Sequence, residues 1–129
     1  MFKYLIVCLA LCSLAVSERV RKSFSEVDVG VRKCFKENSL TAEQTAQILR
    51  KEIPDEPEVR QLLLCSSLAL DIFSIPEGFD VDRMNKMLVT NLSKDEKQQI
   101  IHKCVDSNEQ KNPPDEWVFR VHKCLAILL

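Results

Sequence analysis

Glycine is scarce in this chain, which has two in 129 residues, Gly30 and Gly78, and no Asn-Gly or Asp-Gly pair. Tight β-hairpins depend on such residues because their central positions need positive φ. A protein built on a sheet would need more turns of this kind. The scarcity therefore argues against a β fold.

The sequence also lacks the short motifs of common enzyme classes. It contains no Gly-x-Ser-x-Gly, no His-Glu-x-x-His and no glycine-rich phosphate loop. Acidic pairs occur at Asp80 with Asp82 and at Asp95 with Glu96. They fall where helix caps and first turns favour negative charge. We predict that the protein is not an enzyme and uses no cofactor.

Neither sign of charge dominates. The chain has 18 basic and 19 acidic residues, a net charge of -1, and no run of either sign. Nucleic acids and anionic membrane surfaces attract proteins with concentrated positive charge. We therefore expect neither as a partner.

Long apolar runs are absent apart from one short segment after Lys3. A basic residue, a short apolar stretch and small residues at Ala15 and Ser17 are typical of a cleaved signal peptide. The stretch is shorter than the roughly 20 residues that a membrane span requires. We expect residues 1–17 to be removed and residues 18–129 to form one secreted, extracellular domain.

Cysteine is the residue type that stands out. Cys8 and Cys12 leave with the predicted signal peptide, and four remain: Cys34, Cys65, Cys104 and Cys124. An even number in an oxidising compartment predicts two disulfides, although four cysteines alone allow three pairings. A domain of this size buries only about two thirds of its unfolded surface. The disulfides supply the stability that such a core lacks.

Apolar residues recur at helical spacing in six segments. The first has a stripe made of Val20, Phe24, Val27, Val31, Cys34 and Phe35. Thr41 with Gln44 predicts a capping box for the second, which ends near Ile53. The third runs through Phe73 and is apolar on nearly every side, so we place it at the centre.

Three further helices follow the turn at Pro76, Glu77 and Gly78. Asp80 caps the fourth and Ser93 caps the fifth, while Pro113 and Pro114 start the sixth. Six short helices with polar connections predict an all-α, compact six-helix domain with two disulfides.

The cysteine spacing and helix order together resemble the insect odorant-binding proteins, which are secreted six-helix carriers of small apolar molecules. The intervals between the four cysteines hold 30, 38 and 19 residues. Most of that family has six cysteines, with three residues between the second and third and eight between the fifth and sixth. Aligned on that pattern, the second falls on Gln61 and the fifth on Asp115. The chain is thus similar to the four-cysteine, minus-C branch.

The resemblance implies the pairings Cys34 with Cys65 and Cys104 with Cys124. It also implies an internal apolar cavity that holds an odorant, pheromone or similar lipophile. The inward positions expected to line it are Leu64, Leu68, Ile72, Phe73, Met84, Met87, Leu88, Trp117, Val118 and Val121. Methionine adapts to irregular shapes, and a pocket with few polar groups selects by size and hydrophobicity. Each of these residues is equally well explained as ordinary core.

The resemblance further suggests a membrane chemoreceptor as a partner, and a monomer or weak homodimer. Apolar tails such as Leu125 to Leu129 fold back into the pocket wall in some relatives.

The repeated triplets His102-Lys103-Cys104 and His122-Lys123-Cys124 raise the question of a zinc site. Residues two apart on a helix point roughly 200° apart, so His102 and Cys104 do not converge on one metal. We therefore expect no metal. If both cysteines face inward, both histidines face outward as surface residues, with pH-tuned ligand release as the alternative role.

Two other functions fit the same composition. One is a secreted helical signalling protein with a filled core and an exposed apolar patch that binds a receptor. The other is a carrier of the same fold that works in haemolymph or reproductive secretions rather than in olfaction. An apolar cavity in the structure would favour the carrier over the signalling protein. The tissue in which the protein is expressed would distinguish an olfactory carrier from one in haemolymph or reproductive secretions.

Overall fold

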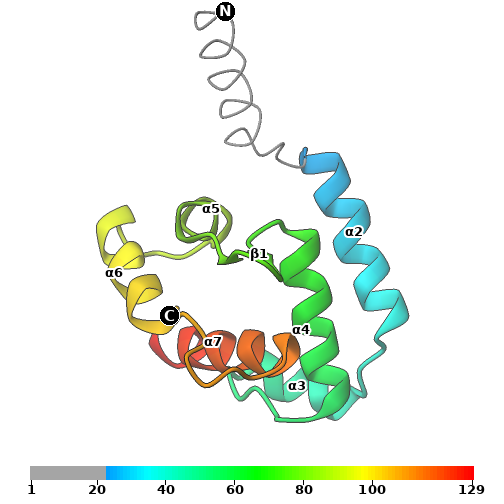
Figure 1. Cartoon of the computed structure of the whole chain (residues 1–129). Helices are drawn as coiled ribbons and strands as arrows, with labels where there is room; N and C mark the ends of the chain where they lie inside the picture. The colour runs from blue at the N-terminus through cyan, green and yellow to red at the C-terminus, as the bar shows by residue number, and fades with distance from the viewer. Residues whose placement is uncertain (1–22) are drawn as a thin grey trace, which may run out of the picture.

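The structure, a computed structural model, describes residues 23–129 (Figure 1). The predicted signal peptide lies outside these residues. The described part has six helices and one short antiparallel hairpin: α2 (Phe24–Glu37), α3 (Ala42–Leu49), α4 (Pro57–Ala69), β1 (Phe73–Ser74), β2 (Gly78–Phe79), α5 (Val81–Met87), α6 (Lys94–Cys104) and α7 (Pro114–Leu128). The predicted all-α class is confirmed.

Three of the helices begin at side-chain caps that were predicted. Thr41 and Gln44 form a reciprocal capping box at the start of α3. The side chain of Asp80 accepts the amide of Arg83 at the start of α5, and Ser93 does the same for α6. Each cap satisfies a backbone donor that the first helical turn leaves unpaired.

Two helices end earlier than predicted. α4 ends before Phe73 because Asp71 adopts φ of 60° and donates its amide, like Ile72, to a carbonyl of the last turn at 3.2 Å. Lys51, with φ of 63°, closes α3 before Ile53 in the same way. Glycine usually occupies this left-handed position, so neither residue gave a stop signal in the sequence.

The early end of α4 produces a hairpin that the helical pattern concealed. Phe73 pairs with Phe79, and Ser74 pairs with Gly78. Gly78 has φ of 81°, and a Cβ there would lie 2.8 Å from the ring of Trp117. The turn predicted at Pro76 to Gly78 is therefore confirmed, and only glycine fits against the indole at its end.

α4 lies between α2 and α7, while α6 packs against α5 and α7 (Figure 1). α2 approaches α4 so closely that a Cβ at Gly30 would lie 3.1 Å from the Cβ of Ala69. The central position predicted for this helix agrees with the packing.

Two disulfides link neighbouring helices. Cys34 is bonded to Cys65, which joins α2 to α4, and Cys104 is bonded to Cys124, which joins α6 to α7. These are the two pairings that the family resemblance implies. Cross-links of this kind stabilise the fold mainly by restricting the unfolded chain.

Most of the buried apolar side chains form two clusters. The larger contains Ile72, Met84, Ile101, Cys104, Val121 and Leu125. The smaller contains Cys34, Leu62 and Ala69, with Val31, Leu40 and Cys65 packed against it.

Phe35 does not join the second cluster, although it was predicted to face inward. Its side chain is 58% exposed, whereas Val27 and Cys34 on the same helix are buried as expected. The predicted stripe was one position too wide, because Phe35 directly follows Cys34 and points about 100° away from it. Val20 and the side chain of Phe24, also in that stripe, lie outside the described part of the chain.

Across the described residues, no helix combines the length and apolar character needed to cross a membrane.

Candidate functional site

Eight of the ten predicted lining residues lie on α4, β1, α5 and α7, while Ile72 lies just before β1 and Leu88 just after α5. Six belong to the larger cluster or pack against it: Ile72, Met84, Met87, Leu88, Trp117 and Val121. Phe73 joins them through ring contacts with Trp117, and Val118 is fully buried on α7. Leu64 and Leu68 are half-buried on α4. The structure thus brings most of the predicted set together as core.

Three aromatic rings connect this core to the surface. Phe73 lies 4.8 Å from Phe79 and 5.2 Å from Trp117 between ring centroids, and Phe79 lies 5.7 Å from Trp117. Both contacts of Trp117 are edge-to-face, the arrangement that aromatic quadrupoles favour. Phe73 is fully buried while Trp117 is half-buried, so the indole marks the boundary of the core.

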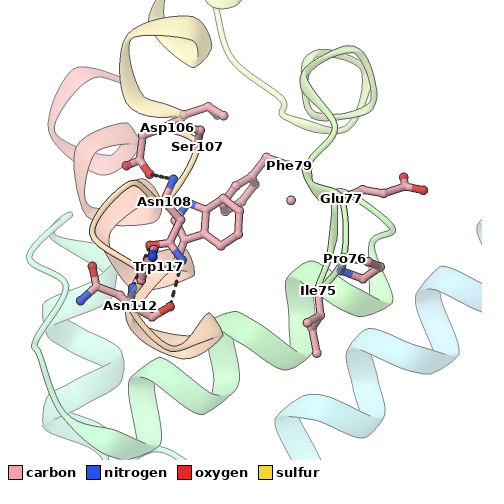
Figure 2. Close-up of a pocket in the computed structure, with 12 residues that line it drawn as sticks. Ile75, Pro76, Glu77, Phe79, Asp106, Ser107, Asn108, Asn112 and Trp117 are labelled. Atoms are coloured by element: carbon pink, nitrogen blue, oxygen red, sulfur yellow. Dashed lines mark hydrogen bonds between the residues drawn. The ribbon is translucent and has the colours of Figure 1, made fainter.

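A pocket of about 540 Å³ opens at this boundary, and we call it the Trp117 pocket. Figure 2 shows Trp117 between the hairpin, which carries Ile75, Pro76 and Phe79, and the loop before α7. The hairpin side of the pocket is apolar except for Glu77. The loop side is polar and contains Asp106, Ser107, Asn108, Lys111 and Asn112. An amphipathic small molecule could place its apolar body against the indole and its polar end toward the loop.

The polar loop is held in shape by side-chain hydrogen bonds. Arg120 on α7 donates from Nε and Nη2 to the Asp106 carboxylate, at 2.9 and 2.8 Å, and from Nη1 to Asn112 Oδ1 at 2.6 Å. Asn108 donates its amide to Asp106, and its own side-chain oxygen accepts the amide of Asn112 (Figure 2). The loop is therefore clamped onto the same helix that carries Trp117.

The contact between Arg120 and Asp106 shifts the pKa values of both side chains. Hydrogen bonds from Arg120 hold the pKa of Asp106 below its usual value, with the Asn108 amide adding to this and burial opposing it. The pKa of Arg120 is raised in turn, chiefly by Asp106. Both groups are charged across the physiological range, so the loop side of the Trp117 pocket keeps its shape at mildly acidic pH.

A second concave surface, which we call the apolar groove, lies on the opposite side of α4. It has a volume of about 700 Å³ and runs between α2, α3 and α4. Its lining is Val31, Phe35, Ser39, Leu40, Thr45, Ile48, Leu49, Leu62, Leu63, Ser66 and Leu70. None of the ten predicted lining residues belongs to it.

The expectation of two outward histidines is wrong for one of them. His102 is exposed on α6. His122 on α7 instead forms a hydrogen bond of 2.8 Å between its Nε2 and Oγ of Ser67, which is fully buried on α4. Burial lowers the pKa of His122 to about 4. The imidazole is therefore neutral at physiological pH and links α4 to α7.

A zinc site at the repeated triplets has no support from the geometry. Cys104 and Cys124 are bonded to each other, so neither offers a thiolate. Among the described residues, no three His, Cys, Asp or Glu side chains are grouped so that they could hold a metal ion.

Sequence reasoning missed two parts of the Trp117 pocket. The hairpin was hidden inside a helical pattern, and Gly78 was its one signal. The loop was recognised only as a polar connection. Its Asp106, Asn108 and Asn112 are residue types whose side chains often hydrogen-bond nearby backbone groups and so stabilise turns. Nothing in the sequence connects these residues to Arg120, which lies 8 to 14 positions away.

The fold and the cysteine framework define a class: a small, disulfide-linked, all-helical protein with one apolar groove and one pocket of mixed polarity. The chain matches the model of the PBP/GOBP family over residues 16–126. It belongs to the PBP/GOBP family.

Two relatives from insects show the same affiliation. General odorant-binding protein 99a of Drosophila melanogaster is 24% identical over 127 residues, covering 95% of this chain and 88% of the relative. Odorant-binding protein 22 of Aedes aegypti is 24% identical over 122 residues, with the same coverage of both chains. Both relatives are named for binding odorants rather than for an enzymatic reaction, so the family supports the role of a small-ligand carrier.

Proposed function

We propose that this protein is a secreted carrier of a small apolar ligand, with no enzymatic activity, and that it belongs to the four-cysteine branch of its family. The support for the branch is the resemblance in cysteine spacing, which aligns Gln61 and Asp115 with the second and fifth cysteines of six-cysteine members. The ligand is an odorant, a pheromone or a lipophile of similar size. Olfactory fluid, haemolymph and reproductive secretions are all suitable places for this role.

The observation that carries the proposal is the position of Trp117. It packs edge-to-face on the buried Phe73 and also lines a pocket of about 540 Å³, within the size range of small-molecule sites. A ligand in this pocket contacts the interior through the indole. Of the ten predicted residues, Trp117 is the one that lines this pocket, and a ligand-binding role for the other nine stays a prediction.

A displacement titration tests this function. The mature protein is loaded with the fluorescent apolar probe N-phenyl-1-naphthylamine, and decan-1-ol is added as a competitor. We expect micromolar binding, because an adaptable apolar wall offers contact area but few directional contacts. Failure of a demonstrably folded protein to bind any apolar probe would overturn the carrier role.

Ile75→Asp assigns the binding to the Trp117 pocket. Ile75 lines this pocket and is 62% exposed, so the change places a charge beside the ligand with little effect on folding. Val89→Asp is the matched control, since Val89 is 98% exposed and lines neither the Trp117 pocket nor the apolar groove. We expect about tenfold weaker binding of decan-1-ol for the first variant, equivalent to about 1.4 kcal/mol, and no change for the second.

A further inference from the structure

The apolar groove between α2, α3 and α4 is separate from the Trp117 pocket and shares no lining residue with it. We propose that it is a second ligand site, which takes an uncharged lipophile with at most one hydroxyl or carbonyl group. The protein would then carry two small molecules on opposite sides of α4.

The groove has a rigid floor. Leu62 is buried in the smaller core cluster, and Val31 and Leu40 pack against that cluster. The Cys34–Cys65 disulfide joins the two helices beneath it. A site whose walls are fixed in advance loses little conformational entropy when a ligand binds.

α3, which forms the outer wall, is also held in place. Gln44 closes the capping box at its start and donates from its side chain to the carboxylate of Glu56, just before α4. Gln44 is buried although it is polar. The wall that carries Ile48 and Leu49 is therefore anchored to the helix across the groove.

The chemistry of the lining identifies the occupant. No charged side chain lines the groove, and its only polar side chains are the hydroxyls of Ser39, Thr45 and Ser66. Thr45 already donates its hydroxyl to the carbonyl of Thr41. An ion in this site would lose its hydration without gaining a counter-charge, whereas a neutral lipophile would lose very little.

The rims expose apolar surface that a ligand would cover. Phe35 on α2 is 58% exposed and Leu49 on α3 is 80% exposed, one on each side of the opening. A volume of about 700 Å³ lies within the range of small-molecule sites, which a lipophile can fill while both rim side chains fold over it.

The two sites can be separated by ¹H–¹⁵N NMR of the mature, disulfide-bonded protein titrated with N-phenyl-1-naphthylamine. We expect two sets of shifted amides, one in residues 31–49 and 62–70 and the other around the hairpin and Trp117. The double variant Phe35→Asp with Leu49→Asp should weaken the first response at least tenfold and leave the Trp117 indole cross-peak responding as before. Both substitutions fall on exposed side chains, and Val89→Asp controls for the loss of an exposed apolar residue.

Three results would overturn the second site. The first is that the groove amides do not shift when the probe is added. The second is that they shift as much in the double variant as in the wild-type protein. Alternatively, sedimentation shows a dimer that the double variant dissociates, in which case the groove binds a second copy of the chain. If the groove amides of the wild-type protein shift but the Trp117 indole cross-peak does not, the result contradicts the proposed function and leaves the second site intact. Failure of the second site is therefore distinguishable from failure of the proposed function.

Discussion

Protonation of His122 should destabilise this protein at acidic pH. The His122 ring is neutral and hydrogen-bonded to the buried Ser67 in the folded state. Burial lowers its pKa from 6.5 to about 4. Between these two values the unfolded chain binds a proton that the folded chain excludes, so the free energy of unfolding falls as the pH decreases.

The magnitude follows from the size of the shift. Each unit of difference between the folded and unfolded pKa corresponds to about 1.4 kcal/mol. For His122 the loss between neutral pH and pH 4 is therefore up to about 3 kcal/mol, with no contribution above pH 7. This is a large part of the 5 to 15 kcal/mol, roughly, that stabilises a typical domain.

Urea unfolding followed by circular dichroism, at a series of pH values and with the disulfides intact, measures this loss. Other groups, such as Asp106, also make stability depend on pH, so the comparison with His122→Gln isolates the histidine. We expect wild type to lose up to about 3 kcal/mol more than this variant between pH 7 and pH 4. His102→Gln, on the exposed face of α6, should behave like wild type. Equal losses in wild type and His122→Gln, or a His122 resonance that titrates near 6.5, would refute the reasoning.

Three further predictions concern stability, and urea unfolding checks each of them. Gly78→Ala should cost about 1 to 3 kcal/mol, because alanine at φ of 81° is strained and its Cβ meets the Trp117 ring at 2.8 Å; an unchanged midpoint would contradict this. Replacing either disulfide by two alanines should cost about 3 kcal/mol, since each closes a loop of 20 to 31 residues; a loss below about 1 kcal/mol would count against the cross-link as a main source of stability. Gln61→Cys with Asp115→Cys should oxidise to a third disulfide that adds less than about 3 kcal/mol, because the change also removes the 3.2 Å ion pair between Arg60 and Asp115; free thiols at both positions by peptide mapping would show that the alignment is wrong.

Local signals in the sequence predicted most of the helix starts and the overall class. Thr41, Asp80 and Ser93 cap the helices that follow them, as expected, because a cap depends on residues within one turn. The helix ends were harder to predict. Lys51 and Asp71 adopt the left-handed conformation that glycine usually takes, so no glycine in the sequence marks these helix ends.

The candidate site was predictable only as a set of apolar residues. Helical periodicity identifies which side chains face inward, and Ile72, Met84 and Val121 are indeed buried together. Periodicity does not show where the packing leaves space. The Trp117 pocket depends on a hairpin and on the contacts of Arg120 with a distant loop, and the position of His122 depends on Ser67 from another helix. Such long-range contacts leave no local pattern in the sequence.

The central claim is that a small apolar ligand binds beside Trp117. Intermolecular nuclear Overhauser effects between decan-1-ol and the labelled mature protein test it most directly, since the chain has one tryptophan and its indole resonances are unambiguous. The account predicts contacts from the alkyl chain to the Trp117 ring and to the side chains of Phe79 and Ile75. Bound decan-1-ol that gives contacts elsewhere in the protein and none to the Trp117 indole would contradict it.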